Sequence, residues 1–411
     1  MRSRTLSSRW LRAAFAAPLL CAAACGPEPQ PQAPALEPQP VTQAPAPQPP
    51  AAQPPAAQPP ASQMPAAPAA AVAVRTPKQV TGVAVSKAGR IFVNFPRWVD
   101  EPTPSVGEVA ADGSLTPYPD AAWNGWQPGK GDAKKQLVCV QSVFVDDTDT
   151  LWILDPAAPG FQGPVPGGPK LLKVNLASNK VERVYSFDAK AAPPNSYLND
   201  VRIANGHALM TDSGLGAIVA LNLTTGAARR LLDKHPSTKA EGGLEPVIGG
   251  KPWRGADGKT PQINSDGIAV DAKREHLYYQ ALTGKTLYRV PVAALLDAKL
   301  SPDALGAKVE RVATTQPADG IEFDAQGNLY LTALEESAIK VLRPDGKLEV
   351  VAQSPEYEWP DSIAIPPSGE LYFTTSQIHH MPPFNGGKDM RKPPYRVYRL
   401  SAAQAAAKPS K

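Results

Sequence analysis

The feature that most constrains this chain is a pattern that occurs six times. Each copy has a short apolar run, a turn rich in Gly, Asp or Asn, and a second apolar run, as in "DGIEFDAQGNLYLTALEES" from Asp319. The other five copies begin at Thr81, Gln141, Asn199, Asp266 and Asp361. Six copies of one hairpin pattern predict six similar structural units placed side by side.

A second hairpin follows the first in most copies. Examples are "GAIVALNLTTGAARRLL" and "AIKVLRPDGKLEVVAQ". Each unit therefore has four strands, and the copies follow one another at intervals of roughly 40 to 70 residues, as the blades of a β-propeller do. The sequence predicts an all-β fold, a six-bladed β-propeller.

Closing such a ring needs a strand from one end of the chain. The candidates are "YRVYRL" at 395–400 and the stretch from Val72 to Val80. An α/β fold would need long helical patterns between the strands, but the plausible helical pieces are only "PVAALLD" and "SAAQAAAK". A β-sandwich competes less well, because units stacked radially leave few open sheet edges.

The first residues resemble an export signal. Four arginines precede an apolar stretch from Ala13 to Ala24, which is too short to span a bilayer as a permanent helix. We therefore expect a signal peptide over residues 1–24. Cys25, followed by Gly26, resembles the lipobox of a bacterial lipoprotein, so lipidation at Cys25 is expected; cleavage without lipid is the alternative, because Ala22 stands where Leu is preferred.

The segment after Cys25 is almost entirely Pro, Ala and Gln, as in "PAPQPPAAQPPAAQPP". Such a composition cannot bury a core, and its prolines favour an extended, semi-rigid spacer. The predicted domain order is a signal peptide at 1–24, an anchor cysteine and disordered linker at 25–70, the propeller at 71–402, and a disordered tail at 403–411. The expected location is the cell envelope, as a lipoprotein of the periplasm or outer membrane, or the secreted fraction.

The charge balance argues against a nucleic-acid partner. The chain has 42 Lys+Arg and 38 Asp+Glu, and the leader carries four Arg and no acid, so the mature chain has as many basic as acidic residues. The partners expected are a small molecule and, through the lipid anchor only, a membrane; the protein is expected to be a monomer.

Cys139, in the apolar run "LVCVQSVFV", is expected to be a buried small hydrophobe and not a nucleophile.

Aspartates stand at the opening of four of the six copies, namely Asp266, Asp319, Asp361 and, directly after Asn199, Asp200. In a propeller the first strand of each blade lines the central channel, so these side chains should converge at one rim of it. Converging oxygen ligands suit Ca²⁺ or Mg²⁺, and the metal ligands predicted are Asn199, Asp266, Asp319 and Asp361. The alternative is that Asp before Gly serves only a local turn. The second strand of each blade ends at the same rim, which adds Asp155, Asp212, Thr283, Glu335, Glu336, Ser376 and Gln377.

Other side chains at this rim could contact an organic ligand. Arg97 and Trp98 follow the second strand of the first copy and could frame such a ligand. The ligand-binding residues predicted are Arg97, Trp98, Gln141, Asp200, Glu335 and Asp361. If the protein is an enzyme, the catalytic candidates are Asp266, Asp319 and His379, the histidine as a general base, with at most one of His379 and His380 facing the channel.

Several segments resemble the major royal jelly protein and yellow family, in its bacterial branch. They include "RIFVNFPRW", "YLNDVRI", "ADGIEFDAQGNLYLT" and "GELYFTTSQIHHMPPFNGGKDMRKPPYRVYR", and the likeness runs in order over about residues 77–402. The resemblance implies a six-bladed propeller with a small-molecule site at its centre. Insect members include proteins implicated in dopachrome conversion and salivary proteins that bind biogenic amines. Insect relatives also have disulfides that this chain lacks.

A more distant likeness is to the calcium-dependent gluconolactonase and regucalcin group. Asp266 and Asp319 match its metal-binding Asp-Gly openings, and Asn199 could replace its Asn, but its first-repeat Glu has no counterpart at Thr81-Gly82. Three hypotheses follow: a propeller that binds a small organic ligand, with or without a divalent cation; a metal-dependent lactonase or dopachrome-type isomerase; and a non-catalytic surface scaffold. The first is favoured, and the acidic ring argues against the third.

Overall fold

The computed structural model describes residues 69–99 and 104–406. The expected signal peptide, the lipidation site Cys25 and nearly all of the Pro-rich linker lie outside this part of the chain. Among the described residues, no helix combines the length and apolar character needed to cross a membrane.

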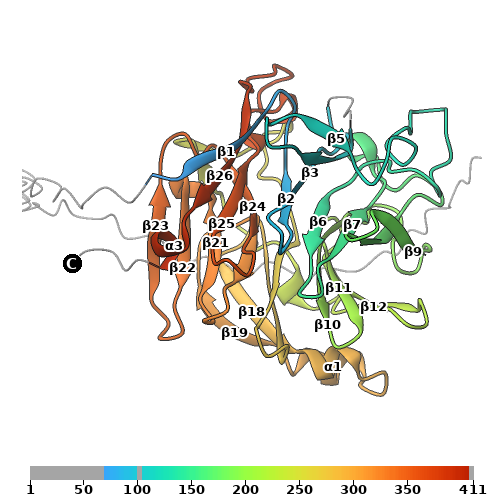
Figure 1. Ribbon diagram of the computed structural model, residues 1–411. Helices are drawn as coiled ribbons and strands as arrows, with labels where there is room; N and C mark the ends of the chain where they lie inside the picture. The colour runs from blue at the N-terminus through green and yellow to red at the C-terminus, as the bar shows by residue number, and fades with distance from the viewer. Residues whose placement is uncertain (1–68, 100–103, 407–411) are drawn as a thin grey trace, which may run out of the picture. The chain divides into compact units, whose positions relative to one another are not determined.

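These residues form six four-stranded antiparallel sheets, the blades of a β-propeller (Figure 1). The first three blades, each from the innermost strand outward, are β2 (Gly82–Val85), β3 (Ile91–Asn94), β4 (Val106–Val109) and β5 (Leu115–Pro117); β6 (Ser142–Val145), β7 (Thr150–Asp155), β8 (Lys170–Asn175) and β9 (Lys180–Ser186); and β10 (Leu198–Ala204), β11 (His207–Asp212), β12 (Ala217–Asn222) and β13 (Ala228–Leu231).

The other three blades follow the same order. They are β16 (Ser265–Val270), β17 (His276–Ala281), β18 (Thr286–Pro291) and β19 (Glu310–Thr314); β20 (Ile321–Phe323), β21 (Leu329–Ala333), β22 (Ala338–Leu342) and β23 (Leu348–Gln353); and β24 (Pro360–Ala364), β25 (Leu371–Thr375), β26 (Tyr395–Leu400) and β1 (Ala71–Thr76). The predicted six-bladed, all-β fold is confirmed.

The remaining elements are short and lie in the connections. They are the hairpin β14 (Val247–Ile248) and β15 (Lys251–Pro252), the helices α1 (Val292–Leu296), α2 (Pro302–Gly306) and α3 (Ala402–Ala406), and the 3-10 turns η1 (Pro159–Phe161), η2 (Pro236–Thr238), η3 (Leu334–Glu336), η4 (Ile378–His380) and η5 (Pro382–Phe384). The segments "PVAALLD" and "SAAQAAAK" therefore do contain helices, as expected.

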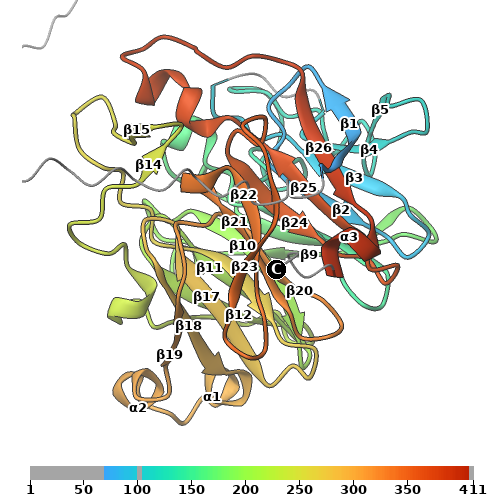
Figure 2. The ribbon, with the colours of Figure 1, turned by 90° about the vertical axis from the view of Figure 1, so that its left-hand side faces the viewer.

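Both chain ends of the described propeller meet in the sixth blade. β1 pairs antiparallel with β26, from Ala71 opposite Arg399 to Thr76 opposite Tyr395. Figure 2 shows these two strands side by side next to β25 and β24. Both candidate closing strands thus contribute, and the ring is closed by hydrogen bonds between residues far apart in the sequence.

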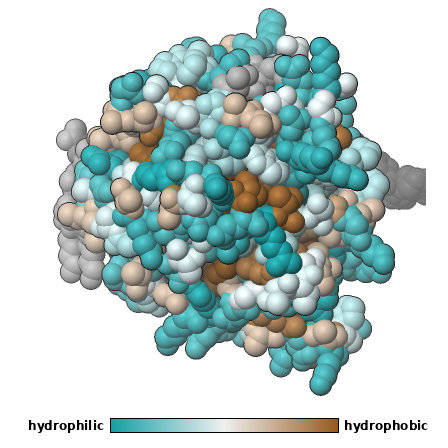
Figure 3. Space-filling view, turned by 45° about the vertical axis from the view of Figure 1, so that its right-hand side comes forward, coloured by the Kyte–Doolittle hydropathy of each residue, from teal (hydrophilic) through white to brown (hydrophobic). Residues whose placement is uncertain are grey.

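The core lies between neighbouring blades. Alternating strand residues of the second and third blades, among them Trp152, Leu171, Val201, Met210 and Val219, form one buried cluster, and similar clusters separate the other blades. The face shown in Figure 3 is mostly hydrophilic, with apolar residues visible between the polar ones near its centre. The apolar side of each sheet is therefore covered by the next sheet.

The innermost strands carry bulges at the upper mouth of the channel, the end where they begin. The pairing register shifts between Leu198 and Val201 in β10, between Ser265 and Ile268 in β16, and between Pro360 and Ile363 in β24. A bulge inserts an extra residue and redirects its side chain. In all three strands the residues inside the bulge include the aspartate that opens the repeat.

Buried threonines on the second strands form hydrogen bonds with the backbone at these bulges. The Thr374 hydroxyl accepts the N–H of Ser362 at 3.1 Å and donates to the Thr81 carbonyl of the first blade at 2.6 Å. Thr211 likewise accepts from Asp200 at 3.3 Å and donates to the Asp266 carbonyl of the next blade at 2.7 Å. In each case one hydroxyl therefore accepts a backbone N–H at the bulge and also links two neighbouring blades by a hydrogen bond.

We predict that Thr374→Val destabilises the propeller by about 1–3 kcal/mol, because it leaves a buried carbonyl and a strand N–H without a partner. Thr374→Ser keeps the hydroxyl and should cost clearly less. Urea unfolding followed by tryptophan fluorescence measures both. Equal losses for the two variants would contradict a role for the hydroxyl.

Candidate functional site

Three aspartates are buried together at the upper mouth of the channel. Asp266 is 4% exposed, Asp319 8% and Asp361 4%, and burial raises the pKa of each, while the Asp319 charge further raises the pKa values of Asp266 and Asp361. The Asp266 and Asp319 carboxyl groups are close enough for each to shift the pKa of the other. Two buried carboxyl groups in such proximity avoid repulsion if one of them carries a proton.

The pair holds about one negative charge at neutral pH. Burial raises the pKa of Asp319 to about 6, against a lowering contribution from the indole N–H of Trp359, which donates to Oδ2 at 2.7 Å. Burial and the Asp319 charge raise the pKa of Asp266 well above its usual range. Asp319 is therefore the ionised member, and Asp266 holds the shared proton.

The glycines after these aspartates allow neighbouring blades to approach closely. A Cβ atom at Gly267 would lie 2.8 Å from the Asp319 carbonyl oxygen, and one at Gly320 would overlap the Asp361 carbonyl oxygen. Asp266 and Gly267 lie within β16, and Asp319 and Gly320 immediately before β20, so neither pair forms a turn. The Asp-Gly pattern reflects close packing around the channel and not turn chemistry.

An aromatic pocket of about 230 Å³ lies above Asp266 and Asp319. Six aromatic rings contribute to its lining, from loops of different blades: Trp98, Phe161, Tyr197, Trp253, Trp359 and Phe384. The other lining residues are polar or aliphatic, and none of those described around this pocket is Lys, Arg or His. We call this cavity the upper pocket.

Contacts between the rings hold the walls of the upper pocket in place. Trp98 stacks on Phe161 with ring centres 5.1 Å apart and donates its indole N–H to the Tyr197 hydroxyl at 2.7 Å. Tyr197 in turn donates to Gln141 at 2.8 Å. On the opposite side, Trp253 packs edge-on against Trp359 at 5.0 Å. The rings are thus positioned without a ligand.

Arg202 crosses the channel below the upper pocket. Its guanidinium donates to Asp200 and to the Ile321 carbonyl at 2.8 and 3.1 Å, pairs with Glu322 at 2.9 Å, and lies 4.8 Å from the centre of the Phe144 ring. These groups belong to β10, β20 and β6, so the arginine links three blades through the channel.

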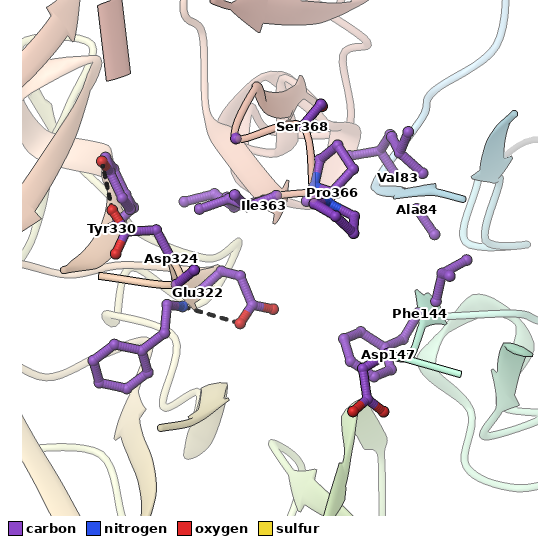
Figure 4. Close-up of a pocket in the computed structure, with 18 of the residues that line it drawn as sticks. Val83, Ala84, Phe144, Asp147, Glu322, Asp324, Tyr330, Ile363, Pro366 and Ser368 are labelled. Atoms are coloured by element: carbon purple, nitrogen blue, oxygen red, sulfur yellow. Dashed lines mark hydrogen bonds between the residues drawn. The ribbon is translucent and has the colours of Figure 1, made fainter. Parts of the chain in front are cut away.

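A second cavity of about 640 Å³ opens below Arg202. Asp200, Arg202 and Glu322 lie at its inner end, and apolar residues such as Val83 and Ile363 form much of its wall, as Figure 4 shows for the labelled side chains. Toward its outer part, Asp324 accepts hydrogen bonds from Asn328 and Tyr330. The two cavities share no lining residue.

The structure brings five of the residues predicted for the site together at the upper pocket. Its lining includes Trp98, Gln141, Asn199, Asp266 and Asp319. Asp200 instead lines the lower cavity, paired with Arg202. Asp361 lines neither cavity, and its buried Oδ2 has no hydrogen-bond partner.

Arg97, Glu335 and His379 lie outside both cavities. Arg97 donates to the carbonyls of Val138 and Trp126, so it fixes a loop behind Trp98. Glu335 accepts from the Val247 N–H and from Lys285. His379 stacks on the far side of Trp359, with ring centres 5.9 Å apart. Their sequence neighbours reach the upper mouth, but these side chains turn away from it.

The other acidic residues expected at this rim are held in ion pairs. The fully buried Asp155 pairs with Lys170 at 2.8 Å, and Asp212 with Arg230 at 2.7 Å. Glu336 pairs with Lys340 at 2.7 Å. These groups stabilise loops, and none of them lines the upper pocket. Cys139 is buried, as expected, and burial raises the pKa of its thiol to about 12.

Metal binding by the predicted ligands Asn199, Asp266, Asp319 and Asp361 stays a prediction. Among the residues that the structure describes, the two groups of at least three Asp, Glu, His or Cys side chains with ligand atoms within 4.8 Å of one another are Glu358, His379 and His380, and Asp271, Glu275 and His276. Neither group contains Asp266, Asp319 or Asp361.

Five of the six rings around the upper pocket went unrecognised in the sequence. Phe161, Tyr197, Trp253 and Phe384 come from long connections that carry no repeat signal. Trp359 had a usable signal, since it stands two residues before the repeat-opening Asp361 in "EWPD".

The fold and site define a β-propeller with an acidic, aromatic pocket at one mouth of its channel. The family model for major royal jelly protein matches residues 138–408, more than half of the chain. The protein belongs to the major royal jelly protein family.

The chain is also similar to curated relatives and to solved structures. The chain is 28% identical over 141 residues to protein yellow of Drosophila pseudoobscura pseudoobscura and of Drosophila guanche, covering 32% of this chain. The match spans 24% of the length of those fly proteins. Similar solved structures include a gluconolactonase from Xanthomonas campestris (12% identity, TM-score 0.49, 80% of this chain and 88% of that one) and virginiamycin B lyase from Staphylococcus aureus (13%, 0.43, 78% and 94%).

The buried Asp319 predicts a dependence of stability on pH. Its pKa is about 6 in the folded protein and near 3.9 in an unfolded chain, so the folded state holds more protons between these values. Its contribution to the free energy of unfolding is therefore present below pH 4 and lost as the pH rises to 6. Relative to Asp319→Asn, the wild type should lose on the order of 1–3 kcal/mol across this range. The prediction is contradicted if the free energies of unfolding of the wild type and Asp319→Asn, measured in urea, change in parallel with pH.

We also predict that Gly320→Ala lowers the free energy of unfolding by about 1–3 kcal/mol, because the added methyl overlaps the Asp361 carbonyl. Gly242→Ala is the matched control, since nothing lies within 4 Å of a Cβ there. The control should change stability by less than about 0.5 kcal/mol. Thermal unfolding compares the two, and similar melting temperatures would show that the blades can separate without cost.

Proposed function

We propose that the upper pocket binds a small organic ammonium ion with an aromatic or similarly flat apolar group. The observation that carries the proposal is the pairing of one buried negative charge, on Asp319 with Asp266, with six aromatic rings above it. No basic side chain among the described lining residues neutralises that charge. A cationic ligand would do so.

The charge of the pair matches a monovalent cation. Because Asp266 and Asp319 hold one proton between them, a single ammonium group balances the remaining charge. Its N–H groups can donate to carboxylate oxygens, while aromatic faces stabilise a nearby cation by about 0.5–2 kcal/mol each. A carboxylate ligand would instead meet repulsion in a site with little water.

The volume of the pocket limits the size of the ligand. A cavity of roughly 150 Å³ accepts benzene, so about 230 Å³ accommodates one aromatic ring with a short side chain. Trp98 and Phe161 on one side and Trp253 and Trp359 on the other offer ring faces and edges to such a group. Membership of the major royal jelly protein family is consistent with a small-molecule site in this position.

The alternatives have less support. A metal-dependent lactonase would need oxygen ligands around a divalent ion, and Asp266, Asp319 and Asp361 are not among the described side-chain groups with three ligand atoms within 4.8 Å of one another. A scaffold without a ligand does not account for unneutralised buried acids. The export signal and the lipobox-like Cys25 support a binding function outside the cytoplasm, at the cell envelope or in the secreted fraction.

Isothermal titration with 2-phenylethylamine tests the proposal. We expect one site per chain with a dissociation constant in the micromolar range, and binding of the anionic analogue 3-phenylpropionate at least tenfold weaker, because the buried charge repels it. Asp319→Asn should weaken amine binding at least tenfold. The matched control is Glu310→Gln, which removes an exposed acid on β19.

Two outcomes would overturn the proposal. One is equal affinity for the amine and the acid; the other is amine binding that Asp319→Asn leaves unchanged. A parallel titration with Ca²⁺ and Mg²⁺ separates the competing hypothesis: binding of either ion, lost in Asp319→Asn and displaced by no amine, would make the acidic site a metal centre.

A further inference from the structure

We infer that Glu358, His379 and His380 form a binding site for a divalent transition-metal ion, behind the wall of the upper pocket. One ring nitrogen from each histidine and one carboxylate oxygen lie within 4.8 Å of one another. His380 Nε2 is 3.2 Å from Glu358 Oε1, and the two imidazole rings are 3.9 Å apart at their centres. We call these three residues the His–His–Glu cluster.

The backbone explains how two adjacent histidines come to the same side. Gln377 is in the left-handed region, with φ 53° and ψ 34°, and η4 follows it directly. In an extended strand neighbouring side chains point to opposite sides, but in a tight helical turn they do not. Both imidazoles therefore lie beside the segment that carries Glu358.

Backbone hydrogen bonds hold the parts of the cluster together. The Gln377 N–H donates to the Glu358 carbonyl at 3.1 Å, and the Ser376 N–H to the Trp359 carbonyl at 3.0 Å. The Met390 N–H donates to the His380 carbonyl at 2.9 Å, and Asn385 to the His379 carbonyl at 2.8 Å. The geometry thus depends on the frame of the sixth blade and not on free side chains.

One ring nitrogen of His379 has no hydrogen-bond partner. Its Nδ1 is buried and has no hydrogen-bond partner. Stacking on Trp359, with planes 13° apart, fixes the orientation of the ring. A buried ring nitrogen without a partner is costly unless it meets a donor or a metal ion.

The donor set selects the class of metal. Two imidazoles and one carboxylate suit Zn²⁺ and related ions, whereas Ca²⁺ and Mg²⁺ prefer sites made of oxygen. Ligand atoms around tetrahedral zinc are roughly 3.4 Å apart, given bonds of about 2.0–2.1 Å. The His380–Glu358 pair, at 3.2 Å, is close to that spacing, and a His379 nitrogen lies within 4.8 Å of both. Three protein ligands leave the fourth position to water or another molecule.

The test is titration of the chelator-treated full chain with Zn²⁺ and with Co²⁺, after alkylation of accessible thiols. Zinc should bind at one site with micromolar or tighter affinity and raise the melting temperature. Cobalt should give the intense visible absorption of a four-coordinate ion. His379→Gln and Glu358→Gln should each weaken zinc binding at least tenfold.

His276→Gln is the matched control, because it removes the histidine of the other carboxylate–histidine group, with Asp271 and Glu275. It should leave zinc binding unchanged. Melting temperatures measured without metal show whether His379→Gln or Glu358→Gln is folded. The inference is overturned if the wild type binds no zinc, if binding survives both cluster variants in folded form, or if His276→Gln abolishes it.

Discussion

The structure around the channel depends on a hydrogen bond that recurs at two blade junctions, from a threonine hydroxyl on a second strand to a carbonyl of the next blade. Thr211 and Thr374 each make this bond while accepting an N–H from a bulged first strand. The bulge points the neighbouring aspartate in a direction that regular strand pairing does not allow. The threonine hydroxyl gives the backbone groups at the bulge a hydrogen-bond partner. Ring closure and the placement of the acidic groups therefore have a common cause.

Burial of several carboxylates near one axis is expensive, and the protein reduces the cost in two ways. Below, Arg202 pairs with both Asp200 and Glu322, so its charge offsets part of theirs and makes that level of the channel structural. Above, Asp266 and Asp319 share a proton and accept the Trp359 N–H, which leaves one charge facing the aromatic pocket. An acid that is paired with an arginine supports the fold. An acid whose charge faces the pocket without a basic partner is available to a ligand.

The sequence was sufficient for the fold because the information is periodic. Six equivalent hairpins and turn residues specify six blades, and the first residue of each repeat specifies which side chains approach the axis. It was not sufficient for residues whose direction depends on a loop. Arg97 and Glu335 adjoin the site in sequence but donate to or accept from loop backbone. The His–His–Glu cluster joins residues about twenty positions apart, and an extended "IHH" would have separated the two rings.

Arg202 also determines how molecules can move through the propeller. Its contacts with Asp200, Ile321 and Glu322 cross the channel between the upper pocket and the second cavity, which share no lining residue. A molecule bound in the upper pocket, as proposed, would have its direct exit at the upper mouth. Its residence time is then set by the loops that carry Trp98, Trp253 and Phe384, so exchange rates can change through loop sequence while the blades stay the same.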